Sequence, residues 1–108
     1  MSSRRGASPS KQQFSDQVEK IFRISAPDGT VAEVTLVEFK DIADTEAVET
    51  FSLLFQVPAN LAVAQGTYRA ENDEMEPMDI FLVPIRRNGE GLYLEAIFNR
   101  LKQKGAGA

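Results

Sequence analysis

An acidic segment at residues 71–79 is the densest group of side chains in this chain that could bind or react. Calcium sites take about six to eight oxygen ligands from a shaped loop, and the EF-hand pattern with its central glycine is absent here. We therefore predict a solvated hairpin loop, and the alternative is a weak cation site. The same loop is our candidate contact for a partner, through Glu71, Asp73, Glu74, Met75, Glu76 and Met78.

The chain contains neither histidine nor cysteine. Disulfides, thiolate nucleophiles and zinc–sulfur sites are excluded, and the commonest general base near neutral pH is missing. A pair of carboxylates could still flank a bond, as in glycosidases. Glu95 is the strongest single candidate, but the alternation around it predicts that it faces outward from a strand. We expect no catalytic residue, no cofactor and no tight metal site.

A glycine-rich break at residues 88–91, Asn-Gly-Glu-Gly, is a second stretch that could hold a ligand. A phosphate-binding loop needs such glycines between a strand and a helix N-terminus, so that backbone amides converge on the anion. Here both flanks read as strands, at 80–87 and 92–100. The break therefore predicts the turn of a hairpin.

Alternation of apolar and polar residues predicts the other strands, at 20–26, 30–40, 49–57 and 67–72. Ser10 can cap a short helix from Lys11 to about Val18, and residues 41–48 read as an acidic loop. Pro84 cannot donate to a ladder, so it predicts a bulge or an edge position. The side chains expected to be largely buried are Phe51, Leu53, Phe55, Ile80, Leu82, Leu94 and Phe98.

Together these elements predict a mostly all-β fold of about six antiparallel strands with short connections. Apolar residues on both faces of 80–85 favour a sheet folded over itself, as a small meander barrel or a sandwich, with the helix plugging one end. A length of 108 residues predicts one domain. We expect a disordered basic N-terminus at 1–10, a single β domain at 11–100 and a flexible tail at 101–108.

Charge is segregated along the chain. Residues 1–23 hold five basic and two acidic side chains, and residues 86–108 repeat that count, whereas residues 24–85 hold twelve acidic and two basic ones. Lys40 and Arg69 alone cannot build a basic stripe, so nucleic-acid binding is disfavoured. No apolar run is long enough to span a bilayer, and the N-terminus lacks the apolar core of a signal peptide. We expect no membrane contact and a cytoplasmic location.

Four motifs in order resemble a family of small bacterial proteins known only as a domain of unknown function. They are FSLLFQVP at 51–58, QGTY at 65–68, FLVP at 81–84 and YLEAIFN at 93–99, within a resemblance that covers roughly residues 14–99. Genes of the family often lie near those of phage-tail-collar-like proteins, so the resemblance implies an accessory or assembly role. The family has no assigned catalytic residues. The basic N-terminus and the acidic segment 71–79 depart from its pattern.

Three classes of function are therefore weighed. We expect a non-catalytic protein-interaction or assembly protein, with a protein partner or self-association. Such a protein needs an exposed strand edge or an apolar patch, and we predict a filled core with an exposed edge. The alternative is a carrier of a small apolar ligand, which needs a pocket of roughly 300 Å³ or more. The third is an enzyme that works through carboxylates.

Overall fold

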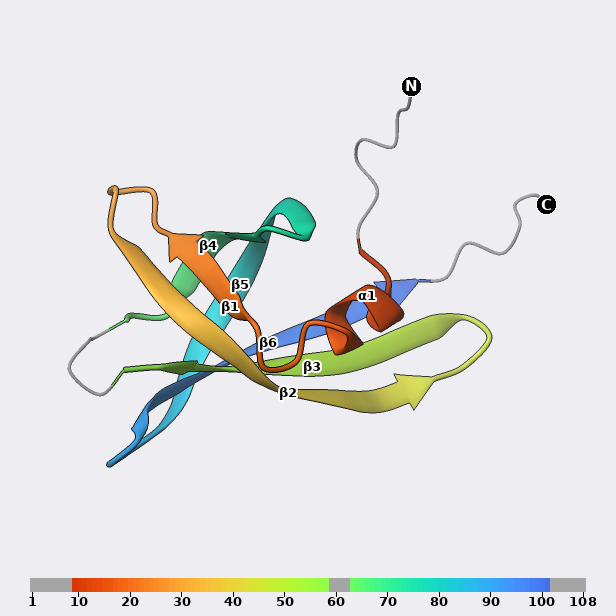
Figure 1. The fold of residues 1–108 in the computed structure, drawn as a ribbon. Coiled ribbons are helices and arrows are strands. Elements are labelled where there is room, and N and C mark those ends of the chain that lie inside the picture. Colours follow the sequence, from red (N-terminus) through yellow and green to blue (C-terminus); the bar gives the residue numbers. More distant parts are fainter. Residues whose placement is uncertain (1–8, 59–62, 102–108) are drawn as a thin grey trace, which may run out of the picture.

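A computed structural model describes residues 9–58 and 63–101 as one short helix and six strands wound into a closed barrel (Figure 1). The elements in chain order are α1 (Lys11–Ser15), β1 (Ile21–Ser25), β2 (Val31–Asp44), β3 (Val48–Val57), β4 (Gly66–Asn72), β5 (Met75–Asn88) and β6 (Gly91–Leu101). The mostly all-β fold with six antiparallel strands is thereby confirmed. The predictions for 1–8, for 59–62 and for 102–108 lie outside the described residues, and Leu101 belongs to β6.

Neighbouring strands around the barrel follow the order β1-β2-β3-β6-β5-β4, with β4 returning to β1. Two three-stranded meanders, β1-β2-β3 and β4-β5-β6, are therefore joined side by side through β3 and β6. The predicted meander holds within each half. It is interrupted between β3 and β4, which are consecutive in the chain but are not neighbours in the barrel.

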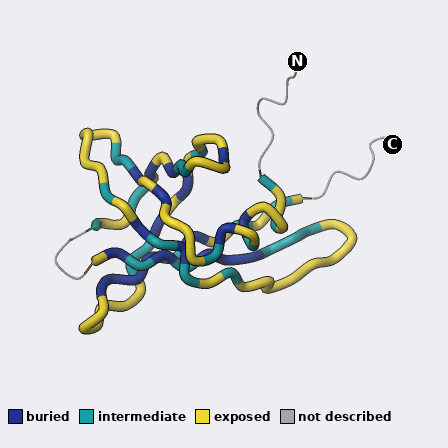
Figure 2. Tube along the Cα trace, viewed as in Figure 1, coloured by how far each residue is buried: buried dark blue, intermediate teal, exposed yellow. Residues whose placement is uncertain are grey.

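The interior is filled by the inward residues of each strand. The predicted core residues on β3, together with Ile80, Leu82 and Leu94, are all buried. Phe98 is only partly buried, yet its ring packs against the core. Figure 2 shows the buried positions running along the barrel walls and the exposed ones gathered at the turns and at the projecting end of β2 and β3.

Several boundaries differ from the sequence prediction. β2 continues through residues 41–44, although the sequence predicts a loop at 41–48, and the turn is reduced to 45–47. The hydroxyl of Thr45 accepts hydrogen bonds from the backbone N–H groups of Ala47 and Val48, which explains how so short a turn is held. The helix ends at Ser15 rather than near Val18, because the following residues turn toward β2.

The turn within the acidic segment 71–79 is also shorter than the predicted loop. β5 already begins at Met75, and the turn between β4 and β5 is held by the Asn72 side chain, whose Oδ1 accepts hydrogen bonds from the N–H groups of Glu74 and Met75. The sequence predicts a solvated loop at 71–79, but residues 71–72 belong to β4 and residues 75–79 to β5. One asparagine side chain is enough to close the turn instead.

The hairpin at 88–91 and the bulge at Pro84 are both as predicted. Asn88 pairs with Gly91 across the turn, and Oδ1 of Asn88 accepts the Glu90 N–H. The β5–β6 register shifts between Pro84 and Arg86. The missing N–H of proline explains the break in the ladder at this point.

Beyond the closed barrel, three strands project together. Residues 36–44 of β2 pair with β3 on one side, and residues 96–101 of β6 pair with β3 on its other side. The ladders of β1 on β2 and of β5 on β6 have ended before these residues. We call residues 36–44, 48–55 and 96–101 the arm. The prediction of an exposed strand edge is therefore wrong for the barrel, because the barrel closes. It is correct only in the arm, where β2 and β6 extend beyond the strands that pair with them in the barrel.

Candidate functional site

The inner face of the arm is covered by the segment that precedes β1. We call residues 9–20, which include α1, the strap. Ser10 caps α1: its hydroxyl accepts the Gln13 N–H, and the Gln13 side chain accepts the Ser10 N–H. This capping box explains how a helix of five residues can form at all. It also directs Phe14 into the barrel.

Phe14 closes this end of the core. Its ring is fully buried and lies 5.6 Å from the ring of Phe51 and 5.1 Å from that of Phe98, measured between centroids. Phe51 and Phe98 stack on each other at 4.9 Å, and Phe39 stacks on Phe51 from the other side. The sequence prediction that the helix plugs one end is therefore correct.

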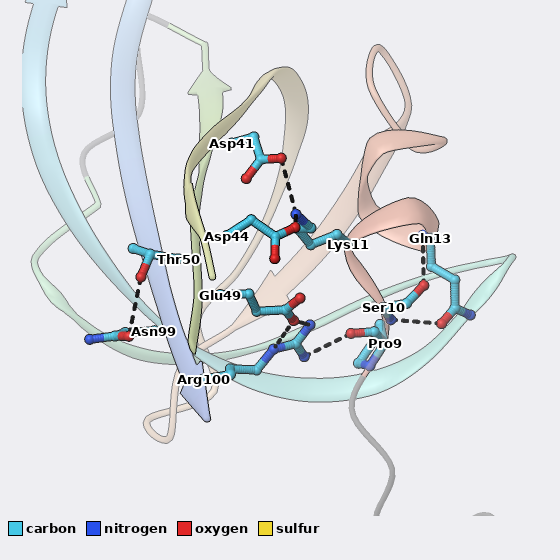
Figure 3. A network of polar contacts seen from close by, with 10 residues as sticks. All are labelled: Pro9, Ser10, Lys11, Gln13, Asp41, Asp44, Glu49, Thr50, Asn99 and Arg100. Atoms are coloured by element: carbon cyan, nitrogen blue, oxygen red, sulfur yellow. Dashed lines mark hydrogen bonds and ion pairs between the residues drawn. The ribbon is translucent and has the colours of Figure 1, made fainter. Parts of the chain in front are cut away.

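Polar contacts tie the strap to the arm (Figure 3). Arg100 donates two hydrogen bonds to Glu49, at 3.0 and 2.7 Å, and one to the carbonyl of Pro9 at 2.8 Å. Lys11 lies between Asp41 and Asp44, with Nζ 3.0 and 2.5 Å from their carboxylates. These hydrogen bonds, first to Asp44 and then to Asp41, raise the pKa of Lys11. The charged groups on the inner face of the arm therefore have partners within the chain.

The predicted acidic contact region divides into two groups. Glu74 accepts hydrogen bonds from Lys20 and Gln17, and these partners lower its pKa, Lys20 most. Glu71 pairs with Arg23 across neighbouring strands, with an N–O distance of 3.1 Å.

The two methionines and the remaining acids of that region have different environments. Met75 is buried in the core, and Met78 packs against it. Asp73 and Glu76 are exposed. Among residues 9–58 and 63–101, no group of three or more acidic side chains could hold a metal ion. A contact between this region and a partner, or with a weakly held cation, stays a prediction.

Glu95 lies on the outer face of β6, as the alternation predicts. Its neighbours Leu94 and Ala96 are buried in the core, and it pairs laterally with Leu54 and Val83. No described contact supplies a second carboxylate beside it. The enzyme alternative therefore gains no supporting observation from the described part of the chain.

A pocket of about 200 Å³ lies at the opposite end of the barrel from the strap. Small or apolar side chains line it: Ile24, Ala26, Ala32, Val63, Ala64 and Tyr68, with Asp28 and Thr30 from the β1–β2 turn. The Tyr68 hydroxyl donates to the Ala64 carbonyl at 2.6 Å, so its polar group is already satisfied. The Thr30 N–H, which donates to Asp28, lowers the pKa of that carboxyl and keeps it ionised.

Exposed apolar side chains gather on the arm. Ile42, Ile97 and Leu101 are 51%, 60% and 80% exposed, and all three lie in its outer strands. Ile97 and Leu101 alternate with Ala96, Phe98 and Arg100, which face the strap, so they lie on the outer face. Sequence reasoning missed this feature because an isolated strand pattern does not reveal where a neighbouring strand ends.

Comparison with known families finds one family that matches most of the chain. Residues 9–98 match the family described as a domain of unknown function, DUF6916. The chain belongs to this family. No curated protein and no solved structure matches the chain.

The DUF6916 match begins with the strap and runs to within three residues of the end of β6. Strap, barrel and most of the arm therefore belong to one family unit. The family description assigns no residue a role. None of the helices in the described residues is long and apolar enough to cross a membrane.

Proposed function

We propose that this DUF6916 domain is a non-catalytic protein-interaction module that binds an extended segment of a partner protein through its arm. The observation that carries the proposal is the one-sided pairing of the arm's two outer strands. An edge strand presents N–H and C=O groups that an added strand can satisfy, which is a recurring mode of peptide recognition.

The apolar side chains of the arm support the same proposal. Ile97 and Leu101 lie four residues apart on the outer face of β6, at its free edge. An added strand would cover alternate side chains of this kind while its backbone pairs with the edge. The resemblance to proteins encoded near phage-tail-collar-like genes points to the same class of role, including an assembly role beside phage-tail-like proteins.

A charge placed on this face tests the proposal. Ile97→Lys should abolish capture of the partner from the native host, because a buried ammonium would need a counter-charge in the interface. Phe81→Lys is the matched control: Phe81 is 52% exposed, close to Ile97, but lies on β5 outside the arm. The measurement is affinity capture with mass-spectrometric identification. Equal capture by wild type and Ile97→Lys, with loss in Phe81→Lys, would move the site to the barrel wall.

The pocket at the far end favours a second candidate, a carrier of a small apolar molecule. Its volume of about 200 Å³ is below the roughly 300 Å³ at which drug-sized ligand pockets begin, but an apolar cavity of about 150 Å³ can hold benzene. Titration with benzene, followed by the methyl NMR signal of Ile24, tests it. Saturable shifts that disappear in Ala32→Leu would favour the carrier; unchanged spectra would oppose it.

A further inference from the structure

The edge of β6 is the more regular of the two edges of the arm. β2 has two register shifts within the arm, and the strap already binds the backbone groups of Leu36 on its edge. β6 pairs with β3 in an unbroken register over residues 92–101. Because a bulge bends a strand and disrupts its ladder, an added strand is expected on β6 rather than on β2.

The backbone contacts of the neighbouring strands fix which groups β6 presents at this edge. Leu36 directs its N–H and C=O to the strap, so its partner Phe55 directs its own groups to β6, because antiparallel pairs alternate between bonding and facing away. Phe55 pairs with Leu94, which therefore faces β3. Pro84 pairs with Leu94 from the other side, and a residue without an N–H fits such a non-bonded pair. The odd-numbered residues of β6 consequently face away from β3.

Past Glu95, these odd-numbered residues have no strand beside them. The β5–β6 ladder ends at Glu95, and the preceding part of β5 pairs with β4 instead, so β5 diverges from β6 (Figure 1). The strap contacts this part of β6 through the inward side chains of Phe98 and Arg100. Within the described part of the chain, no backbone group outside β3 bonds that of residues 97–101. The edge therefore offers the N–H and C=O groups of Ile97, Asn99 and Leu101.

Two copies of this edge match when they run antiparallel about Asn99. Ile97 of each copy then lies directly opposite Leu101 of the other, and the two Asn99 residues face each other. Every one of these pairs is in the phase that exchanges both backbone hydrogen bonds. Facing apolar side chains stabilise a ladder, and the side-chain N–H groups of Asn99, whose oxygen accepts the Thr50 hydroxyl, can donate to the second copy. The edge is therefore complementary to itself in one register.

We propose that the edge of β6 pairs with the same edge of a second copy, in a two-fold dimer centred on Asn99. The inference rests on the proposed function, because it uses the arm as the interaction surface and names one partner of it. β5 of neither copy occupies the paired stretch of 97–101, since its last pair with β6 is at Glu95. A two-fold contact of this kind is closed, so it yields a dimer and not a fibre.

Single cysteines test this register, because the chain contains none of its own. Asn99→Cys should form a disulfide-linked dimer under mild oxidation, since facing residues of a bonded pair have Cα atoms about 5.5 Å apart, within the reach of a disulfide. Thr50→Cys is the matched control: Thr50 lies beside Asn99 on the outer face but between β2 and β6, away from the edge. It should stay monomeric on a non-reducing gel.

Two further cysteines separate this register from chance collisions. Ile97→Cys alone and Leu101→Cys alone should not cross-link, because like residues of the two copies are then four positions apart along the ladder, about 13 Å. An equal mixture of the two variants should cross-link, since residue 97 of one copy faces residue 101 of the other.

Sedimentation velocity over a series of protein concentrations tests the backbone pairing without cysteines. Asn99→Pro removes the N–H at the axis, which faces the free edge, so it spares the ladder with β3 and should raise the dimer dissociation constant at least about tenfold. Asn99→Ala keeps that N–H and should dimerise nearly as wild type does. Thermal unfolding followed by circular dichroism checks that both variants fold, and the cysteine series decides alone if the proline variant does not.

The self-pairing is overturned if wild type stays monomeric at every concentration, if Thr50→Cys cross-links as readily as Asn99→Cys, or if Ile97→Cys alone cross-links as readily as the mixture. Partner capture in the Ile97→Lys experiment is judged separately. Capture that is present in wild type and lost in Ile97→Lys, with no dimer, would overturn the self-pairing and leave the proposed function standing.

Discussion

The two ends of the barrel are closed by different means. At the strap end, the large ring of Phe14 enters from outside the sheet and meets Phe51 and Phe98. At the far end, where the β1–β2 and β5–β6 turns lie (Figure 1), the inward positions include Ala26 and Ala32, and a volume of about 200 Å³ remains open. One end is filled by the packing of large rings, and the other keeps an open volume lined mostly by small or apolar side chains.

This difference suggests that the strap end contributes more to the stability of the fold and that the far end keeps an accessible volume. A barrel of six strands has an interior that must be filled at both ends, and a large ring displaces water more completely than alanine does. The strap end is therefore expected to dominate the free energy of unfolding. The far end can change in volume at small cost.

The largest effect is expected at the strap end. Phe14→Ala should lower the free energy of unfolding by about 3–5 kcal/mol, because it removes a fully buried ring and leaves a cavity beside two others. Phe55→Ala, in the barrel wall beside Phe22, should cost about the same. Chemical denaturation followed by far-ultraviolet circular dichroism measures both.

The control for these variants is Phe81→Ala, whose ring is 52% exposed and should cost less than about 1 kcal/mol. A loss below about 1 kcal/mol for Phe14→Ala would mean that the strap is not part of the core. The two ends would then not differ in the way described.

The strap and the barrel could be predicted from sequence to different degrees. Alternation within single strands identified the inward residues, because burial on one face of a strand leaves a period of two. Ser10 marked the helix start through its capping chemistry. The closing of the turns by Thr45 and Asn72 was missed, because side chains that bind the backbone locally also occur in longer loops.

The candidate surfaces were harder to predict. The sequence points to Glu74 and Glu71 as a contact region, but the fold brings Lys20 and Arg23 from β1 and the strap against them. The arm depends on where one ladder ends beside another, and no local pattern encodes this.

The second effect concerns the backbone at the far end. Gly91 has φ of 143°, a conformation nearly restricted to glycine, and a Cβ built there would lie 2.2 Å from the Val57 carbonyl oxygen. Gly91→Ala should therefore lower the free energy of unfolding by at least about 1–3 kcal/mol. Gly89→Ala is the control, since a Cβ there meets nothing within 4 Å. Equal stability of the two variants in urea denaturation would show that the β3–β6 contact can shift freely.

A smaller effect, of opposite sign, is expected inside the pocket. Ala32→Leu extends a side chain into the open volume and should raise the free energy of unfolding by up to about 1 kcal/mol. The melting temperature and urea midpoint measure it, with benzene binding as a second readout. A loss of more than about 1 kcal/mol would indicate overpacking, and the far end would then be as tightly filled as the strap end.

The smallest effects are electrostatic, and the two ends of the barrel differ in what lowers the pKa of a carboxyl there. The pKa of Glu74 at the strap end is lowered chiefly by Lys20, and that of Asp28 at the far end chiefly by the Thr30 backbone N–H. A carboxyl whose pKa is lower in the folded state stabilises the fold above its unfolded pKa, about 4 for both residues. That contribution is lost as the pH falls through the folded pKa.

Lys20→Met should therefore raise the pKa of Glu74 toward its ordinary value and leave that of Asp28 unchanged, because a hydrogen bond from a backbone N–H does not depend on the lysine. Carboxyl NMR titration from about pH 2 to about pH 7, the range in which carboxyl groups titrate, measures the pKa of both groups in one sample. Thr30→Pro removes the N–H and should do the reverse, raising the pKa of Asp28 alone. If Lys20→Met moved both pKa values together, the two ends would share one electrostatic environment, and the contrast between the filled strap end and the open far end would not extend to charge.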